Sequence, residues 1–484
     1  MNIPQVVLLC GMTLACGVAI AQPDYALQAT PVGPAPVDPA IARALASIKP
    51  DSIEETIKTL VGFGTRSTLS SMATDLPPGQ GINAAADWIA GQYEAISHEC
   101  GGCLEVKRDT FTADPASASG SPWAGRIPKP TKLTNVYAIL RGTDPAQAKR
   151  MVLVTGHYDS RNLNILDDHG TAPGANDDAS GVAVSLECAR ALSKMKFPGT
   201  IVFAAVAGEE QGLVGSGHLA KLAKEEGWDL EAVLNNDIVG GNTTPGDTVQ
   251  LKDRVRVFSE GVPQAATPEE ARRIRALGKE DDSSSRELAR AIAETARTYF
   301  SKPGAAKPFS AFLVARPDRY LRGGDHSSFN HEGFAAVRFT EWREDYNHQH
   351  QDVVQPAPGS DTPVLGDLIE FVDFNYVAQV ARLNAATLAT LAFAPGEPQN
   401  VTLVNKMAEN GSTLTWEPPT GGGVAHYEVL WRETTSNNWQ YVKQLVAPTT
   451  DGPVTLSLPI SKDNVIFGVR AVDAKGHRGL VVVP

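Results

Sequence analysis

The chain has 484 residues, of which 42% are hydrophobic and 20% are charged, and its formal net charge is −12. This length is too great for one compact domain, and the composition is ordinary for a soluble globular protein with a large core. The excess of negative charge argues against a nucleic-acid-binding surface, so we expect no nucleic acid among its partners.

An apolar run over residues 6–20 ends in Ala19-Ile20-Ala21, which is an A-x-A cleavage pattern. It predicts that residues 1–21 are a secretory signal peptide, although the Lys or Arg usual near the start is missing. The alternative, a membrane anchor, requires about twenty apolar residues, and no segment of the chain is long enough. We therefore expect export to the periplasm or the extracellular space, and no membrane span.

Two of the five cysteines, Cys100 and Cys103, form a CGGC pair. In an oxidising compartment such a pair is expected to close as a short-loop disulfide. The alternatives are a redox pair, which lacks the βαβ pattern, and half of a zinc site, which lacks a second Cys pair. Cys188 lies in a helical pattern and is expected to be a small buried hydrophobic residue.

The segment after the predicted signal peptide, residues 22–38, is rich in Pro and Ala and is expected to be an extended lead-in. Helical periodicity follows over residues 39–48, 52–61 and 82–96. The loop 62–81 contains Arg66, Ser67 and Thr68. Two interpretations of this loop stay open, the border of a functional site and a plain surface connection.

From residue 133 the pattern changes to short β-rich runs that alternate with helical patterns. The β-rich runs cover residues 135–140, 151–155, 200–207, 232–235 and 335–340, and the helical patterns cover residues 180–195, 212–226, 284–299 and 365–391. This alternation predicts an α/β domain over residues 39–393, with an open, mostly parallel twisted sheet and helices on both faces. Residues 240–282 are polar and are expected to form an excursion with one short strand, residues 255–258.

After a linker, residues 399–484 show alternating strands and frequent turn signals, which predict a small all-β sandwich. The motifs LTWEPP, HYEVLWR and FGVRAVDAKG resemble the fibronectin type III family. Trp416 and Tyr427 match core positions of that family, and Phe467 stands where a Tyr is common. We interpret this segment as a spacer or as a module that binds a surface or a polymer.

Acidic and histidine side chains follow the predicted strands of the α/β domain at the points where the strands end. They are His157 and Asp159, Glu209 and Glu210, Asp237, and Glu341 followed by NHQHQD at residues 347–352. Asp177 and Asp178 stand at the entrance of the helix that follows the first of these strands. Ligands of open α/β sheets bind beyond the carboxyl ends of the strands, and these residue types bind divalent metals.

Two histidines and three carboxylates suit a pair of zinc-type ions that share one carboxylate. Such a pair activates a water and polarises a carbonyl, and a general base is then needed to take the water proton. The doublet Glu209-Glu210 can supply both a ligand and this base, because adjacent side chains in a loop point in different directions.

The motifs GHYDS, GANDDASG, GEEQGLVGS, NNDIVG and HxxxD occur in this order. The set, over about residues 39–391, resembles the M28 family of co-catalytic zinc aminopeptidases. This resemblance implies two Zn²⁺ ions with the ligands His157, Asp177, Glu210, Asp237 and His348, of which Asp177 bridges the ions. It also implies that Glu209 is the general base, that Asp159 orients the ring of His157, and that Asp178 follows an unusual peptide bond.

Three details of the resemblance depend on less specific signals. His348 is preferred to His350 only because it lies four residues before Asp352. Tyr346 stands one residue before the position at which a Tyr of this family can hold the oxyanion. Asp325 and His326 match a pocket segment of the family, where they support the ligands, face the substrate or belong to a hydrogen-bonded loop.

The resemblance implies an exported di-zinc aminopeptidase that acts on the N-termini of peptides or proteins. A carboxypeptidase or a glutaminyl-cyclase-like enzyme of the same fold is the nearest alternative. The presence of all five ligand positions argues against the cyclase. A catalytically silent binding protein is the alternative of another class. The presence of the ligands and of Glu209 is against it.

Overall fold

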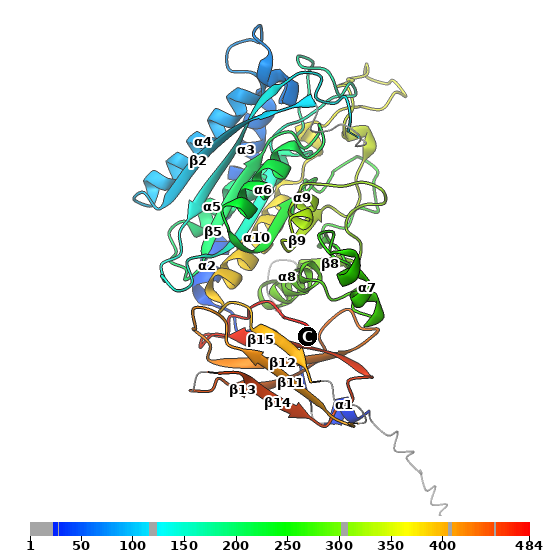
Figure 1. Ribbon diagram of the computed structural model, residues 1–484. Helices are drawn as coiled ribbons and strands as arrows, with labels where there is room; N and C mark the ends of the chain where they lie inside the picture. Colours follow the sequence, from blue (N-terminus) through cyan, green and yellow to red (C-terminus); the bar gives the residue numbers. More distant parts are fainter. Residues whose placement is uncertain (1–22, 28, 116–122, 302–307, 405–408, 450–451) are drawn as a thin grey trace, which may run out of the picture.

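The structure is a computed structural model that describes residues 23–484 apart from residues 28, 116–122, 302–307, 405–408 and 450–451. It consists of an α/β domain and a smaller β-sandwich, which lies at the bottom of Figure 1. The predicted signal peptide lies outside the described residues. Within the part of the chain that is described, no helix is both long enough and apolar enough to cross a membrane.

An eight-stranded sheet forms the centre of the α/β domain, in the order β2-β3-β5-β4-β6-β9-β7-β8. The strands are β2 (Leu104–Ala113), β3 (Thr131–Leu140), β4 (Arg150–His157), β5 (Thr200–Val206), β6 (Asp229–Asn236), β7 (Arg254–Ser259), β8 (Ser310–Val314) and β9 (Ala336–Thr340). The central strands β5, β4, β6 and β9 are parallel, whereas β3 and β7 run antiparallel to them. The predicted open, mostly parallel sheet is confirmed.

Helices cover both faces of this sheet (Figure 1). The helices of the domain are α2 (Pro39–Ser47), α3 (Pro50–Gly62), α4 (Gly81–Glu99), α5 (Ala179–Leu192), α6 (Val214–Glu225), α7 (Pro268–Ala276), α8 (Ser284–Phe300), α9 (His326–His331) and α10 (Phe374–Phe393), of which α7 has no buried residue. Side chains of β4 alternate between the faces, since Val152 and Val154 join the core with α5 and α10, whereas Met151 and Leu153 join the core with α6 and α9. This two-sided burial explains the continuous apolar sequence of the strand.

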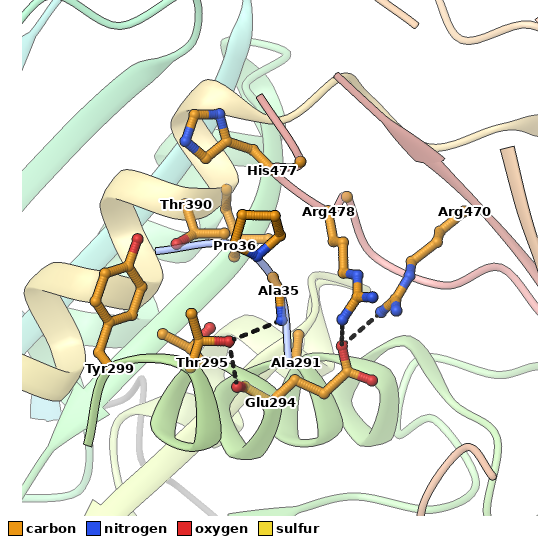
Figure 2. Close-up of a pocket in the computed structure, with 14 residues that line it drawn as sticks. Ala35, Pro36, Ala291, Glu294, Thr295, Tyr299, Thr390, Arg470, His477 and Arg478 are labelled. Carbon is orange, nitrogen blue, oxygen red and sulfur yellow. Dashed lines mark hydrogen bonds and ion pairs between the residues drawn. The ribbon is translucent and has the colours of Figure 1, made fainter. Parts of the chain in front are cut away.

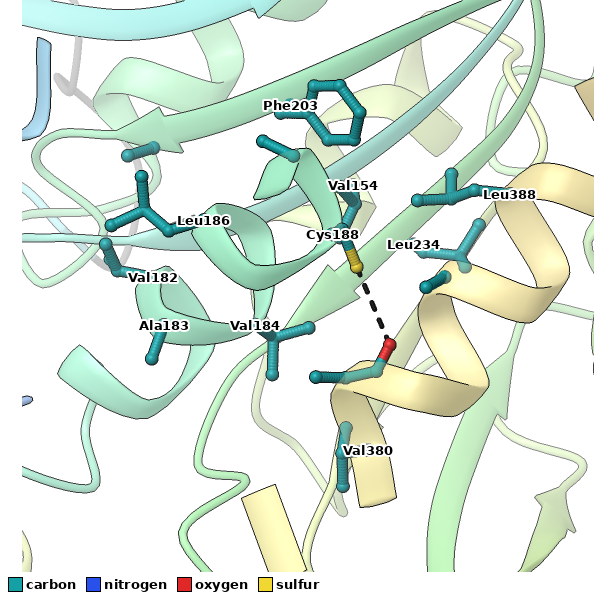
Figure 3. Packing of buried hydrophobic residues seen from close by; sticks show 14 of the residues in the cluster. Val154, Val182, Ala183, Val184, Leu186, Cys188, Phe203, Leu234, Val380 and Leu388 are labelled. Atoms are coloured by element: carbon teal, nitrogen blue, oxygen red, sulfur yellow. Dashed lines mark hydrogen bonds between the residues drawn. The ribbon is translucent and has the colours of Figure 1, made fainter. Parts of the chain in front are cut away.

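The described cysteines are found as expected. Figure 3 shows Cys188 of α5 in the larger core, in one cluster with Val154 of β4 and Leu388 of α10. Its side chain is fully buried, and its Sγ donates to the Ala381 carbonyl over 3.6 Å. Cys100 and Cys103 form the predicted disulfide.

Some elements differ from the sequence predictions for local reasons. The unpredicted β2 pairs only with β3 at the sheet edge, and most of its side chains are exposed or half-buried, so it lacks an apolar run. The predicted excursion contains α7, which begins with a capping box between Thr267 and Glu270. The long last helix begins at Phe374 rather than at residue 365, because the Asp373 carboxylate caps it.

The last part of the chain forms two facing sheets, in the orders β10-β11-β14 and β1-β13-β12-β15. Their strands are β1 (Thr30–Pro31), β10 (Gln399–Leu403), β11 (Ser412–Glu417), β12 (His426–Glu433), β13 (Tyr441–Val446), β14 (Val454–Leu458) and β15 (Val465–Val472). Trp416 and Tyr427, from different sheets, are buried and pack edge to face at 5.3 Å between ring centroids. This arrangement is consistent with the fibronectin type III resemblance.

The segment expected to be a lead-in contributes to this sandwich. After the short helix α1 (Asp24–Leu27), β1 pairs antiparallel with β13. The indole of Trp431 donates to the Tyr25 carbonyl over 2.9 Å, and the Val32 amide donates to the Gln440 carbonyl over 2.9 Å. Both ends of the described chain therefore belong to the same small domain.

The sandwich docks on the α/β domain through buried charges around α8. Arg432 of β12 and Asp282 form an ion pair in which both side chains are fully buried. Arg470 of β15 contacts Glu294 of α8 at 2.7 Å, and Figure 2 shows this contact beside a cavity at the domain boundary. Trp439 donates to Glu287 of α8 over 2.8 Å. Buried ionic contacts of this kind fix one domain against the other.

Candidate metal centre

The carboxyl ends of β4 and β6 and the entrance of α5 meet in a buried cluster. His157 is the last residue of β4, Asp237 follows β6, and Asp177 lies just before α5. The Nε2 atom of His157 lies 3.1 Å from Asp177 Oδ1 and 3.9 Å from Asp237 Oδ1. All three side chains are buried, and their potential ligand atoms lie within 4.8 Å of one another.

A second cluster shares Asp177 with the first. The Nε2 atom of His350 lies 2.8 Å from Asp177 Oδ2 and 2.9 Å from Glu210 Oε1. The two oxygens of Asp177 therefore face different clusters, Oδ1 toward His157 and Oδ2 toward His350. This is the arrangement required of a carboxylate that bridges two cations.

The structure brings His350, and not His348, to the site. His348 ends a short 3-10 helix (Tyr346–His348), where its ring stacks on Phe371 at 3.5 Å between centroids and its Nδ1 lies 3.0 Å from Thr244 Oγ1. The backbone at His350 takes a φ of 56°, in the left-handed region, and the ring lies against Glu210. This corrects the choice of His348, which depended only on the spacing to Asp352.

Electrostatics at the second cluster favour a cation. The carboxylates of Glu210 and Asp177 outweigh the effect of burial and raise the pKa of His350 to about 10. Although burial opposes it, contacts with His157 and His350 hold the pKa of Asp177 well below its usual range. Nitrogen and oxygen donors of this kind, gathered around a shared carboxylate, fit zinc.

Asp159 connects three parts of the site. Its carboxylate accepts hydrogen bonds from the backbone amides of Glu209 and Glu210, both at 3.1 Å, and from the Thr68 hydroxyl at 2.9 Å. The Nδ1 atom of His157 lies 3.1 Å from the Asp159 carbonyl oxygen and 3.5 Å from its carboxylate. Asp159 thus positions the Glu209-Glu210 doublet, and it contacts the ring of His157 mainly through its backbone.

Asp178 holds the loop that presents Asp177. The peptide bond between these two residues is cis, as the resemblance implied. One oxygen of the Asp178 carboxylate accepts from the His157 amide over 3.0 Å, and the other accepts from the Gly181 and Ile238 amides over 2.9 and 3.3 Å. One carboxylate therefore ties together β4, the start of α5 and the segment after β6.

Arg66 and Thr68 place the loop 62–81 at the border of the site. Thr68 contacts Asp159, and Arg66 is fully buried. The guanidinium of Arg66 donates to the carbonyl oxygens of Leu60, Tyr158, Pro173 and Gly174, over 2.6–2.9 Å. It thereby fixes the segment before Asp177 relative to the end of β4.

Three supporting residues were missed in the sequence. Asp367 accepts from the backbone amides of Asn176 and Asp177 over 2.8 and 2.7 Å. Arg338 contacts Asp237 at 2.8 Å, and Gln349 donates to Asp177 over 3.0 Å. No motif marked Arg338 or Asp367, Gln349 lies within the NHQHQD stretch but is not a metal-ligand type, and the helical pattern expected over residues 365–391 concealed Asp367.

A cavity opens beside the two clusters, and Glu209, Asp177 and Asp237 line it. Burial and the neighbouring Asp237 and Glu210 raise the pKa of Glu209 well above its usual range, against the opposing effect of His157. Glu209 therefore faces the space where a substrate would lie, and its environment strengthens it as a proton acceptor.

The three residues considered as substrate-facing differ in position. Asp325 and His326 are fully buried and do not belong to the described lining of the cavity, which favours a supporting role over contact with the substrate. His326 lies 2.6 Å from the Pro317 carbonyl oxygen, as in a hydrogen-bonded loop. Tyr346 is 60% exposed, and its hydroxyl accepts from Arg322, which lines the cavity, over 3.3 Å.

Sequence comparisons point to one peptidase family. Residues 135–369 match the family described as Peptidase family M28. A probable zinc metalloprotease of Pyricularia oryzae is 44% identical over 456 residues, which cover 92% of this chain and 84% of the relative. Another from Leptosphaeria maculans is 41% identical, over 94% of this chain and 98% of the relative.

Solved structures with low sequence identity are also similar to this chain. The LapA aminopeptidase of Legionella pneumophila has a TM-score of 0.47 at 19% identity, with 80% of each chain covered. The aminopeptidase of Aneurinibacillus sp. strain AM-1 has a TM-score of 0.47 at 15% identity, with 73% of this chain and 96% of that chain covered.

Proposed function

The chain belongs to peptidase family M28 and is a metallopeptidase, and from this premise we propose that it is a di-zinc aminopeptidase. The observation that carries the proposal is the position of Asp177, whose two oxygens face separate clusters of potential ligands. His157 and Asp237 would hold one zinc ion, Glu210 and His350 would hold the other, and Asp177 would be a ligand common to both. The substrate class is peptides with a free N-terminus.

Different side chains of the site have different roles in hydrolysis. When bound, zinc ions lower the pKa of a water molecule and polarise the carbonyl of the scissile peptide bond. Glu209 lines the cavity beside both clusters, accepts the proton of the attacking water and passes it to the leaving amine. Asp159 holds Glu209 in place through its backbone amide. No covalent intermediate with the protein is formed.

Metal content tests the ligand assignment. We expect about two zinc ions per chain in the purified protein, as in co-catalytic sites. His350→Ala is expected to lose one of them, because its ring lies in the second cluster, whereas the matched variant His348→Ala is expected to keep both. Elemental analysis of the two variants measures this difference. Loss of metal from His348→Ala alone would show that the ligand is His348 after all.

Blocked peptides test the direction of cleavage. Acetylation of the N-terminus is expected to lower kcat/KM by about 10²-fold or more, because a site that binds a free amine rejects analogues without it. The measurement compares one peptide in its free, N-acetylated and C-amidated forms, with the amidated form as the control. Cleavage of the acetylated form from its other end would identify a carboxypeptidase instead.

We also propose that the protein is exported. The proposal depends on the signal-like residues 1–21 and is supported by the disulfide between Cys100 and Cys103, which suits an oxidising compartment. Binding of the C-terminal sandwich to a surface or a polymer stays a prediction.

A further inference from the structure

Two arginines line the cavity on the side of Glu210. The guanidinium of Arg126 donates from Nη1 to the Glu210 carbonyl over 2.7 Å and lies over the Trp123 ring, 4.5 Å from its centroid. Arg161 follows Asp159 and Ser160 in the sequence, and it donates to the carbonyls of Asn162 and Leu163 over 3.0 and 3.1 Å. Both side chains are held in place by neutral backbone acceptors.

Among the described residues, Arg126 and Arg161 lack the carboxylate partner that the other two arginines of the cavity have. Arg319 and Arg322 both pair with the carboxylate of Glu344. For Arg126 and Arg161, no carboxylate lies within ion-pair distance among the described residues, and residues 116–122 contain no acidic side chain. Arg126 and Arg161 line the same cavity, so their positive charges repel each other there. A bound anion would relieve this repulsion.

We propose that Arg126 and Arg161 form a subsite for a carboxylate of the substrate, next to the scissile bond. This inference depends on the proposed function and names the substrate class of the same site. A guanidinium binds a carboxylate through paired, charge-assisted hydrogen bonds, and two guanidiniums beside one cavity favour such a group strongly.

Both acidic and basic side chains line the cavity. Glu209 and Asp237 line the cavity together with Arg126 and Arg161, so it offers carboxylates that attract a free amino group and guanidiniums that repel it. In this proposal the amine of a peptide lies toward Glu209 and Asp237, and a carboxylate of the peptide lies toward Arg126 and Arg161. That carboxylate is either an acidic side chain adjacent to the scissile bond or the C-terminus of a very short peptide.

Matched substrates distinguish these two sources. The first pair compares N-terminal Glu with Gln, the second compares Glu with Gln after the scissile bond, and the third compares a dipeptide with its C-terminal amide. The intact protein is expected to prefer the acid of at least one pair by about tenfold or more in kcat/KM, mainly through KM. Equal rates for acid and amide in all three pairs would overturn the subsite.

Substitutions then assign the preference to the two arginines. Arg126→Gln and Arg161→Gln are each expected to remove most of the preference for the acid, whereas the control Arg141→Gln, an exposed residue paired with Glu105, is expected to keep it. Arg161→Glu is expected to reverse the preference toward a Lys-containing peptide, an outcome that a merely structural role would not produce. A preference that survives in both Gln variants would contradict the assignment.

Binding separates this inference from the proposed function. Calorimetric titration of the metal-loaded Glu209→Gln protein with the preferred acid and its amide is expected to show tighter binding of the acid. This measurement requires no turnover, so a protein that hydrolyses no peptide would contradict the proposed function and still be tested for the subsite. Equal affinity for acid and amide would overturn the subsite alone.

Discussion

Replacing Glu209 by Gln is expected to lower kcat by about 10²–10⁴-fold, the usual contribution of a general base. The amide keeps the size of the side chain and cannot accept the proton. The backbone of residue 209 stays held by Asp159, and the residue belongs to neither cluster of potential ligands. The zinc content is therefore expected to be unchanged. Steady-state kinetics on an aminoacyl substrate and elemental analysis of the same preparation measure both effects.

The adjacent Glu210 provides a contrast for this variant. Glu210→Gln removes a charge from the second cluster, so zinc is expected to be lost together with activity. An exposed carboxylate far from the site, Glu105, serves as the control, and Glu105→Gln is expected to change neither property. Full turnover in Glu209→Gln would show that another group accepts the proton.

Replacing Arg432 by Met is expected to destabilise the protein by about 3–5 kcal/mol, because it removes the nearest partner of the buried Asp282 carboxylate and leaves only Arg290, whose Nη1 lies 4.0 Å away. Both side chains are fully buried at the boundary between the sandwich and the α/β domain. Urea unfolding of the intact chain, followed by fluorescence and by circular dichroism, measures the shift and shows whether the two domains separate first.

Two further variants show that the effect comes from burial of an unpaired charge. Arg141→Met breaks an ion pair with Glu105 whose side chains are 59% and 41% exposed, so a change of less than about 1 kcal/mol is expected. Adding Asp282→Leu to Arg432→Met removes the remaining charge and is expected to recover part of the lost stability. A small effect of Arg432→Met alone would mean that water reaches Asp282.

The sequence was informative where burial on both faces makes a strand apolar. The continuous runs that became β4, β5 and β6 were recognisable, and the polar residues at their ends are the ones that meet in the site. In contrast, β2 is a half-exposed edge strand and α7 has no buried residue, so neither carried a strong pattern.

The site itself was predictable only as far as its residues lie at strand ends or in motifs. The choice between His348 and His350 depends on a left-handed backbone at His350 and on the stacking of His348 against Phe371. Spacing along the chain contains neither fact. Asp367 acts through hydrogen bonds to the backbone of a loop nearly 200 residues earlier, and such contacts leave no local signal.

The pairing of β1 with β13 has a consequence for the order of events during synthesis. Tyr25 and Glu433, which share a hydrogen bond near this pairing, lie 408 residues apart. The segment around β1 therefore lacks its partners β12 and β13 until most of the chain has been made, and contacts between such distant segments form late. We expect the α/β domain to fold before the segment around β1 is fixed, and β1 to pair with β13 only afterwards. A chain truncated before β13 therefore lacks the strand that holds β1 as well as the strands that follow it.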